Sequence, residues 1–229
     1  IDGGVDTSHR AFEPVRLHHF GCGGRQVASA HGTAVASLLA GKRGVGDVYV
    51  ADVYCGEPAG GAVDAVAAGL GWMARERIAV INVSLVGPRN ALLERAVRSL
   101  TARGHVIVAA VGNDGPASPP LYPAAYDGVV GVTGVDGKHR VLIEACRGNH
   151  VDFAALGSDL SAAAQAPDQY VPVRGTSFAA PQVAALLSEL QTPDATLRAQ
   201  LLDKLAARAR DLGKPGRDDV YGAGELAEL

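Results

Sequence analysis

Two hydrophobic patterns alternate along the chain. Short runs of valine, isoleucine and alanine, without regular polar interruptions, are typical of strands that are buried on both faces of a parallel sheet. Other segments carry apolar residues at helical spacing, such as Leu93, Val97 and Leu100 within residues 89–103. The patterns predict strands at residues 48–54, 78–86, 105–111 and 129–135, and helices at residues 61–77, 89–103, 177–190 and 196–210.

The order of these elements indicates the fold class. Alternation of strand and helix predicts an α/β fold, with a doubly wound, mostly parallel sheet and helices on both faces in three layers. Residues 177–190 are apolar almost all round, so we expect this helix to be buried. Catalytic residues in such sheets lie beyond the carboxyl ends of the strands, which makes the polar residues there the candidates.

Composition and charge narrow the classes of function. The 229 residues favour one domain, residues 1–229, and 48% hydrophobic with 20% charged residues is typical of a globular protein. Lys and Arg (21) nearly balance Asp and Glu (24), for a net charge of −3, so we expect no nucleic-acid partner. The apolar runs are too short for a membrane span. The opening Ile1-Asp2-Gly3-Gly4 has no feature of a signal peptide.

The cysteines Cys22, Cys55 and Cys146 allow at most one disulfide within the chain. They are widely spaced and form no C-x-x-C pair, and we interpret them as free or buried thiols. His18 and His19 precede Cys22, but no further ligand follows at the spacing of a zinc site. We therefore interpret these histidines as part of a surface loop.

The sharpest chemical signal is the block Gly175-Thr176-Ser177-Phe178-Ala179-Ala180-Pro181. Ser177 opens a buried apolar helix, so its hydroxyl would lie at the positive end of the helix dipole. Gly175 would let a substrate backbone approach closely, and Pro181 falls in the first turns, where a missing N–H is tolerated. A plain N-cap serine is the alternative, but it does not explain the Gly, the Thr and the Pro in one block.

Three further polar residues stand where a strand ends or a helix begins. Asp2 precedes two glycines, and alone it is better explained as a turn residue. His31 begins a helix of small residues, where a partly buried structural histidine is an equal alternative. Asn113 follows an apolar strand, where it is either a turn residue or an amide donor aimed at a developing negative charge.

Together these segments resemble the subtilisin-like serine proteases, the subtilases. The chain has the family's segments in the family's order. They are the turn at Asp2, the helix start His31-Gly32-Thr33-x-Val35-Ala36, the strand with Asn82-x-Ser84-Leu85, the strand end at Asn113 and the block Gly175–Pro181 around Ser177. The resemblance covers essentially the whole chain, as far as residues 221–224. The chain order Asp, His, Ser also differs from the His, Asp, Ser order of chymotrypsin-like enzymes.

The resemblance implies a serine endopeptidase that works through an acyl-enzyme intermediate and needs no cofactor. Ser177 would be the nucleophile, His31 the general base and Asp2 the group that orients the imidazole. The Asn113 amide and the Ser177 backbone N–H would bind the oxyanion. An extended peptide or protein substrate would contact Ser84, Leu85, Val86, Ala110, Val111, Gly112 and Gly175, partly by strand pairing.

The chain departs from the family pattern at three places. Val86 stands where many members have Gly, so we expect a preference for small or medium substrate residues before the cleaved bond. The stretch 41–47 is short where many members have a longer calcium-binding loop, and it offers no ligand cluster, so the sequence predicts no metal-ligating residue and does not support a structural calcium ion. Asp2 is one residue from the chain start, whereas the family's Asp ends a buried strand, so we expect this first strand to be truncated and the native chain to extend upstream.

The family also implies an extracytoplasmic location, secreted or periplasmic, and a propeptide or additional domains as further partners. Two other classes of function stay open. A catalytically silent subtilase-like domain would act as a binding or structural module, and the changed specificity strands and truncated first strand keep it in view. A nucleotide-binding protein would need a phosphate loop, but the glycine clusters at residues 21–24 and 44–46 lack its strand-then-helix context.

Overall fold

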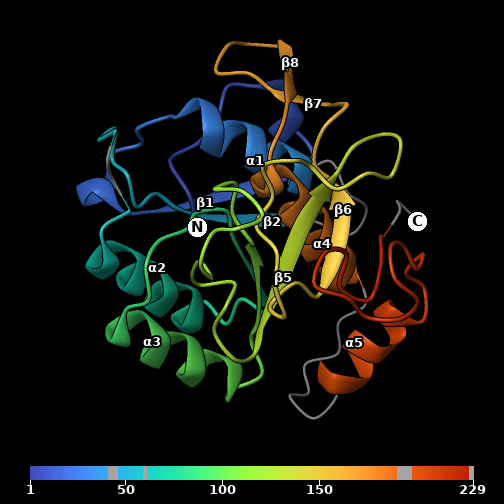
Figure 1. The fold of residues 1–229 in the computed structure, drawn as a ribbon. Coiled ribbons are helices and arrows are strands. Elements are labelled where there is room, and N and C mark those ends of the chain that lie inside the picture. The colour runs from blue at the N-terminus through green and yellow to red at the C-terminus, as the bar shows by residue number, and fades with distance from the viewer. Residues whose placement is uncertain (41–45, 59–60, 190–197, 227–229) are drawn as a thin grey trace.

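Four parallel strands form the central sheet of the computed structural model, which describes residues 1–40, 46–58, 61–189 and 198–226 (Figure 1). Side by side they are β3 (Val80–Val83), β4 (Val106–Ala110), β5 (Val129–Val135) and β6 (Phe153–Leu156). Every residue of β4 and β5 is buried. Burial on both faces explains why these strands contain only Val, Ile, Ala, Gly and Thr.

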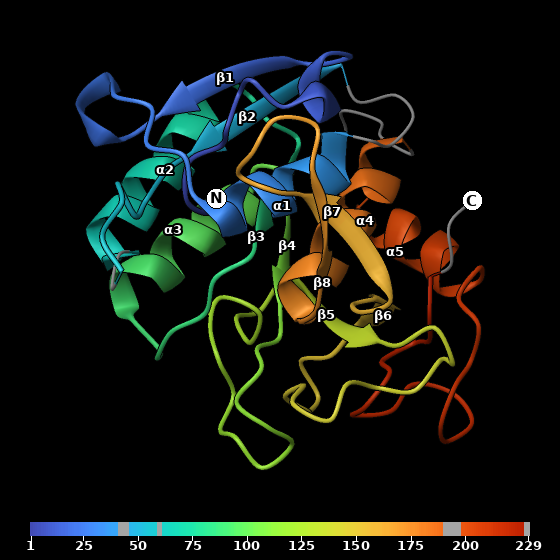
Figure 2. The same cartoon turned by 90° about the horizontal axis from the view of Figure 1, so that it is seen from above.

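Helices cover both faces of the central sheet and so make three layers (Figure 2). One face carries α2 (Val63–Arg75) and α3 (Ala91–Thr101). The other carries α4 (Thr176–Glu189) and α5 (Arg198–Ala206), and α1 (Ala30–Ala40) packs against α4. Each face has its own hydrophobic core. The predicted three-layer α/β fold with a parallel sheet is confirmed.

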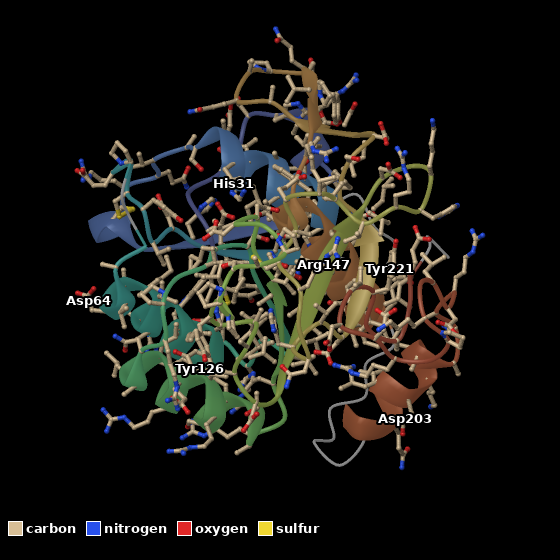
Figure 3. All side chains as sticks on the ribbon, in the orientation of Figure 1. His31, Asp64, Tyr126, Arg147, Asp203 and Tyr221 are labelled. Carbon is tan, nitrogen blue, oxygen red and sulfur yellow. A yellow bond between two sulfur atoms is a disulfide. The ribbon has the colours of Figure 1, made fainter. Side chains whose placement is uncertain are left out.

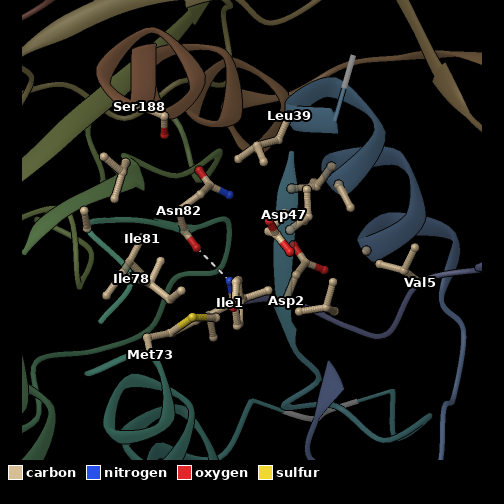
Figure 4. Close-up of a pocket in the computed structure, with 18 of the residues that line it drawn as sticks. Ile1, Asp2, Val5, Leu39, Asp47, Met73, Ile78, Ile81, Asn82 and Ser188 are labelled. Atoms are coloured by element: carbon tan, nitrogen blue, oxygen red, sulfur yellow. Dashed lines mark hydrogen bonds between the residues drawn. The ribbon is translucent and has the colours of Figure 1, made fainter. Parts of the chain in front are cut away.

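A second parallel sheet, β1 (Arg16–Phe20) and β2 (Asp47–Ala51), lies beside β3. Between β2 and β3 is a cavity of about 390 Å³, which residues of both strands line (Figure 4). Ile1 and Asp2 also line it, and the N-terminal amine of Ile1 donates a 2.7 Å hydrogen bond to the carbonyl of Asn82. Asp2 therefore lies at the junction of the two sheets.

The strands β7 (Leu160–Ala163) and β8 (Tyr170–Val173) form an antiparallel hairpin that packs against α1. β8 leads through Arg174 and Gly175 directly into α4. The hairpin therefore leads directly into the block Gly175–Pro181 that contains Ser177. No helix in the described ranges is both long and apolar enough to cross a membrane.

The predicted elements are present with shifted ends. The predicted strands correspond to β2, β3, β4 and β5, and the predicted helices to α2, α3, α4 and α5. Residues 190–197 lie outside the described part of the chain, so the start of the helix predicted at residues 196–210 is not tested there. β1, β6, β7 and β8 were not predicted. β1 and β7 contain polar residues and β8 contains a proline, whereas β6 is an apolar run of only four residues.

The interpretation of His18 and His19 as a surface loop is wrong. Both belong to β1, where His18 pairs with Tyr49 of β2 in the strand register. The His18 ring stacks on the Tyr49 ring, and its Nε2 lies 2.8 Å from a carboxylate oxygen of Asp47. Pairing with β2 orders a segment whose polar residues look like a loop when it is considered alone.

The interpretation of all cysteines as free thiols is also wrong, although the limit of one disulfide holds. Cys22 and Cys55 form a disulfide, and Cys146 is free and buried. The two bonded residues follow β1 and β2, respectively, and the parallel pairing of these strands brings their ends together. The Asp52 N–H donates to the carbonyl of Phe20 at 2.9 Å, and the Cα atoms of the bonded cysteines are 5.2 Å apart.

Candidate active site

Asp2 is held beside the carboxyl end of β2. Its N–H donates to the carbonyl of Ala51 (3.2 Å) and its carbonyl accepts from the N–H of Val53 (2.9 Å), which makes a parallel bridge to Asp52. Asp2 is 7% exposed. One of its carboxylate oxygens accepts a 2.6 Å hydrogen bond from the N–H of Gly3. The backbone of Asp2 is therefore held on both sides by the residues that end and follow β2, and its carboxylate is held by the N–H of Gly3.

The start of α1 packs directly on the backbone that follows Asp2. A Cβ atom at Gly32 would clash with the carbonyl oxygen of Gly3, so a side chain at Gly32 would block this approach. The Ser29 hydroxyl accepts a 2.9 Å hydrogen bond from the N–H of Gly32 and caps the helix. These contacts bring His31 to Asp2.

His31 and Asp2 form a hydrogen-bonded pair. Nδ1 of His31 lies 2.9 Å from each carboxylate oxygen of Asp2. Because a carboxylate accepts hydrogen bonds, Nδ1 carries the proton and Nε2 keeps a lone pair. Burial lowers the pKa of His31, but the hydrogen bond and the charge of Asp2 outweigh it, and the pKa is raised. The side chain lies on α1 (Figure 3) and is 44% exposed, so the ring is a base that is accessible from the pocket.

Ser177 lies in the first turn of α4, at the positive end of the helix dipole. Pro181 inside this helix has no N–H for the carbonyl of Ser177, which lies four residues earlier. The hydroxyl of Ser84 donates to that carbonyl at 2.9 Å instead. The first turn of α4 is therefore tied to the segment that follows β3.

Asn113 follows β4 and lies against the residues that precede Ser177. Its Oδ1 accepts a 3.0 Å hydrogen bond from the N–H of Thr176. Because an N–H needs an acceptor, the amide oxygen faces Thr176, and Nδ2 is directed elsewhere as a donor. A second bond runs from the N–H of Gly112 to Oγ1 of Thr176 (3.2 Å). Gly175 has φ +140°, and a Cβ there would lie 3.3 Å from Nδ2 of Asn113, so glycine leaves room for the amide.

These side chains meet at one pocket of about 310 Å³. It is lined by Asp2, His31, Tyr54, Ser84, Leu85, Val86, Gly112, Asn113 and Ser177. Within the described residues, no hydrogen bond joins the Ser177 hydroxyl to the His31 ring. Such bonds are often long in a free enzyme and tighten in its substrate complex. The pocket is distinct from the larger cavity between β2 and β3, although Asp2 lines both.

The predicted substrate-binding residues divide into two groups. Ser84, Leu85, Val86 and Gly112 line the pocket, and Gly175 borders it through Asn113. Ala110 and Val111 are not among its lining residues, and their side chains are buried in the two hydrophobic cores. The predicted pairing of their backbone with a substrate stays a prediction. Ala110 lies within β4, which pairs with strands on both sides.

Tyr54 is a lining residue that the sequence did not single out. It follows β2 and stands beside Asp2 and His31 in the pocket. Burial raises the pKa of the Tyr54 phenol, and the charge of Asp2 raises it further. Its place just after the carboxyl end of a parallel strand is the signal that could have indicated it.

One group among the described residues brings enough ligand atoms together for a metal ion: Cys22, Asp52 and Cys55, within 4.8 Å of one another. The sulfurs of Cys22 and Cys55 are bonded to each other. A metal would need both of them as thiolates. The oxidised pair is therefore a covalent link between the two loops.

Three features of this α/β fold meet at one pocket. They are a serine at the start of a buried helix, a histidine oriented by a carboxylate, and an amide donor. Together they define a serine hydrolase of the Asp–His–Ser class. Comparisons with known proteins support this class. The model of the Subtilase family matches residues 1–224. A cold-adapted subtilisin-like serine proteinase of known structure superposes with a TM-score of 0.82 at 25% identity, over 99% of this chain and 87% of that one.

Two relatives agree with this family. Minor extracellular protease Epr of Bacillus subtilis (strain 168) is 31% identical over 206 residues, and the match covers 86% of this chain but only 32% of that protein. Subtilisin BL of Lederbergia lenta is 33% identical over 211 residues, which is 87% of this chain and 76% of the relative. The chain belongs to the subtilase family of serine endopeptidases, as the resemblance predicts.

Family membership decides between the classes left open by the sequence. The chain is a subtilisin-like serine protease, and the nucleotide-binding alternative is wrong. Nothing in these comparisons favours a catalytically silent domain, because the matched proteins are proteases by name.

Proposed function

We propose that this chain hydrolyses peptide bonds with Ser177 as nucleophile, His31 as general base and Asp2 as the residue that orients the base. The observation that carries the proposal is the Asp2–His31 pair, with Nδ1 2.9 Å from each carboxylate oxygen, at the pocket that Ser177 and Asn113 also line. A serine hydroxyl is a weak nucleophile at neutral pH and needs a base within reach. The free lone pair on Nε2 of His31 meets that need.

In the first step, Nε2 of His31 takes the proton of the Ser177 hydroxyl as Oγ attacks the scissile carbonyl carbon. The imidazolium that forms is stabilised by Asp2 and then protonates the leaving amine, which gives an acyl-enzyme. A water molecule, deprotonated by the same nitrogen, then attacks the ester carbonyl. The bond between the acyl carbon and Oγ of Ser177 breaks, Nε2 returns the proton to Oγ, and the acid is released. Asp2 keeps the proton on Nδ1 throughout, so that Nε2 is the atom that exchanges it.

Negative charge develops on the carbonyl oxygen in both steps. We propose that Nδ2 of Asn113 and the backbone N–H of Ser177 donate to it. The hydrogen bond from the N–H of Thr176 to Oδ1 of Asn113 supports this role, because it leaves Nδ2 as the amide atom that can donate to the substrate. The dipole of α4 adds positive potential at the same point.

The substrates we propose are extended peptides or protein segments, bound along Ser84, Leu85 and Val86. We further propose that the protein works outside the cytoplasm, since the relative Epr is named as extracellular. Any propeptide or additional domain would be a further partner of the same protease.

We also propose that the chemistry needs no cofactor and that the fold does not depend on calcium. Residues 41–45 of the stretch on which the calcium expectation rests lie outside the described residues. A melting temperature that a chelator leaves unchanged supports this proposal. A large drop in chelator overturns it.

A serine-directed phosphonylating reagent tests the proposed function. We expect the reagent to modify Ser177 in the folded wild-type protein, and modification and peptidase activity to be lost together in Ser177→Ala. Ser188→Ala is the matched control, because Ser188 lies on the same helix and its hydroxyl donates within the helix to Ala184. A folded, unmodified and inactive wild type would instead identify a silent subtilase-like module.

A further inference from the structure

The segment Glu144–Cys146, in the connection between β5 and β6, braces the loop that carries Asn113. The carbonyl of Glu144 accepts a 2.8 Å hydrogen bond from the N–H of Gly115. The N–H of Cys146 donates at 3.0 Å to the carbonyl of Gly112. Both flanks of Asn113 are therefore held by one short segment.

The side chain of Glu144 reaches the other loop of the site. Its Oε1 accepts from Nε of Arg174 at 2.7 Å, and its Oε2 accepts from Nη2 at 2.9 Å. Arg174 lies between β8 and Gly175, in the stretch that leads to Ser177. A two-bond contact of guanidinium with carboxylate fixes orientation as well as distance.

The two loops carry the donors that must converge on the oxyanion, Nδ2 of Asn113 and the N–H of Ser177. They are already joined near the pocket by the bonds that Thr176 makes to Asn113 and Gly112. The contact between Glu144 and Arg174 adds a charged connection further out. Glu144 is thus bound to one loop through its backbone and to the other through its side chain.

We propose that Glu144, together with Arg174, is a positioning residue. It keeps Nδ2 of Asn113 and the backbone N–H of Ser177 directed at the same oxyanion. The proposal rests on the proposed function of these two residues. Its distinguishing consequence is an effect on turnover that exceeds the effect on folding stability. The Arg174 and Glu144 side chains are 50% and 28% exposed, and such pairs contribute little to global stability. Small displacements of catalytic groups are costly to rate.

The test measures kcat and KM on a chromogenic peptide for Glu144→Gln and Arg174→Gln. We expect each variant to lose on the order of 10-fold in kcat with KM within about twofold. The double variant should lose no more than either single one, because both remove the same contact. Arg174→Lys, which keeps the charge but not the fork, should restore only part of the rate.

The decisive comparison uses an Asn113→Ala background. If Glu144 acts through Asn113, Glu144→Gln should lower kcat there much less than in the wild type. Asp47→Asn is the matched control, because Asp47 accepts from Nε and Nη2 of Arg16 at 3.0 and 2.9 Å in a similar exposed pair on β1 and β2. It should leave kcat unchanged.

An unchanged kcat in Glu144→Gln would overturn the proposal, as would an equal loss of kcat in the Asn113→Ala background. A loss confined to KM would also overturn it, since it would indicate substrate contact. These outcomes presuppose a wild type that cleaves the peptide and is modified at Ser177. An inactive and unmodified wild type would overturn the proposed function itself, and this proposal with it.

Discussion

Nδ1 of His31 lies 2.9 Å from both carboxylate oxygens of Asp2, and this contact sets the acid limit of activity. His31 acts as a base only when it is neutral, and its pKa is raised because the bond and charge of Asp2 outweigh burial. We expect kcat/KM to fall as pH drops, with a midpoint above the ordinary histidine pKa of about 6.5.

Replacing Asp2 by Asn should reverse that shift. Burial then remains as the main influence, so we expect the His31 pKa, followed by NMR, to fall below about 6.5, and kcat to fall by about 10⁴-fold. Asp6→Asn is the control, because the Asp6 side chain bonds to Ser8 and not to His31. A His31 pKa that is the same in Asp2→Asn and the wild type would contradict this account.

Val86 should restrict the substrate residue that precedes the cleaved bond. Its side chain is 38% exposed and lines the pocket with Ser177 and Asn113. We expect cleavage profiling with a peptide library to favour small and medium residues at this position, and Val86→Gly to admit large aromatic ones. A wild type that already prefers large aromatics would show that Val86 does not narrow the pocket.

The disulfide between Cys22 and Cys55 should stabilise the fold and support the pocket edge. It joins residues 33 apart in the sequence, and Tyr54 beside Cys55 lines the pocket. For the double variant Cys22→Ser with Cys55→Ser we expect a loss of about 2–5 kcal/mol, which lowers the melting temperature by roughly 4–20 °C. A reducing agent should lower the melting temperature of the wild type but not of this variant. If the reducing agent lowered both melting temperatures equally, its effect would not come from the disulfide between Cys22 and Cys55.

His150 should make the fold sensitive to acid. Neither ring nitrogen has a partner among the described residues, and burial lowers the pKa of the ring against the charges of Asp152 and Asp219. Below about pH 6.5 the unfolded chain binds a proton that the folded chain does not, so stability is lost as pH falls through this value. We expect urea unfolding of His150→Gln to show a shallower decrease between pH 7 and 5. An identical pH dependence in both proteins would contradict this role.

The sequence predicts the parts of this protein that depend on local pattern. The apolar runs of β4 and β5 are strand-like on their own, and the residues around His31 and Ser177 are recognisable before any fold is known. The pairing of Cys22 with Cys55 is different in kind, because it depends on β1 lying parallel to β2. A five-residue strand with two histidines carries no local signal of that pairing.

The same limit applies within the site. Tyr54 lines the pocket because β2 lies beside the central sheet and ends near Asp2 and His31, an arrangement that no local pattern around Tyr54 predicts. Glu144 and Arg174 are 30 positions apart, and nothing in either neighbourhood indicates that they meet. Contacts across the sheet ends decide these cases, and no periodicity in the sequence encodes them.

The docking of α4 against both α1 and the central sheet has a consequence for biosynthesis. Asp2 and His31 leave the ribosome before Ser177, which follows His31 by more than a hundred residues and gains its environment only when α4 is seated. A nascent chain therefore holds the acid and the base long before it holds a working nucleophile. The site can therefore be complete only after α4 has packed against α1 and the central sheet.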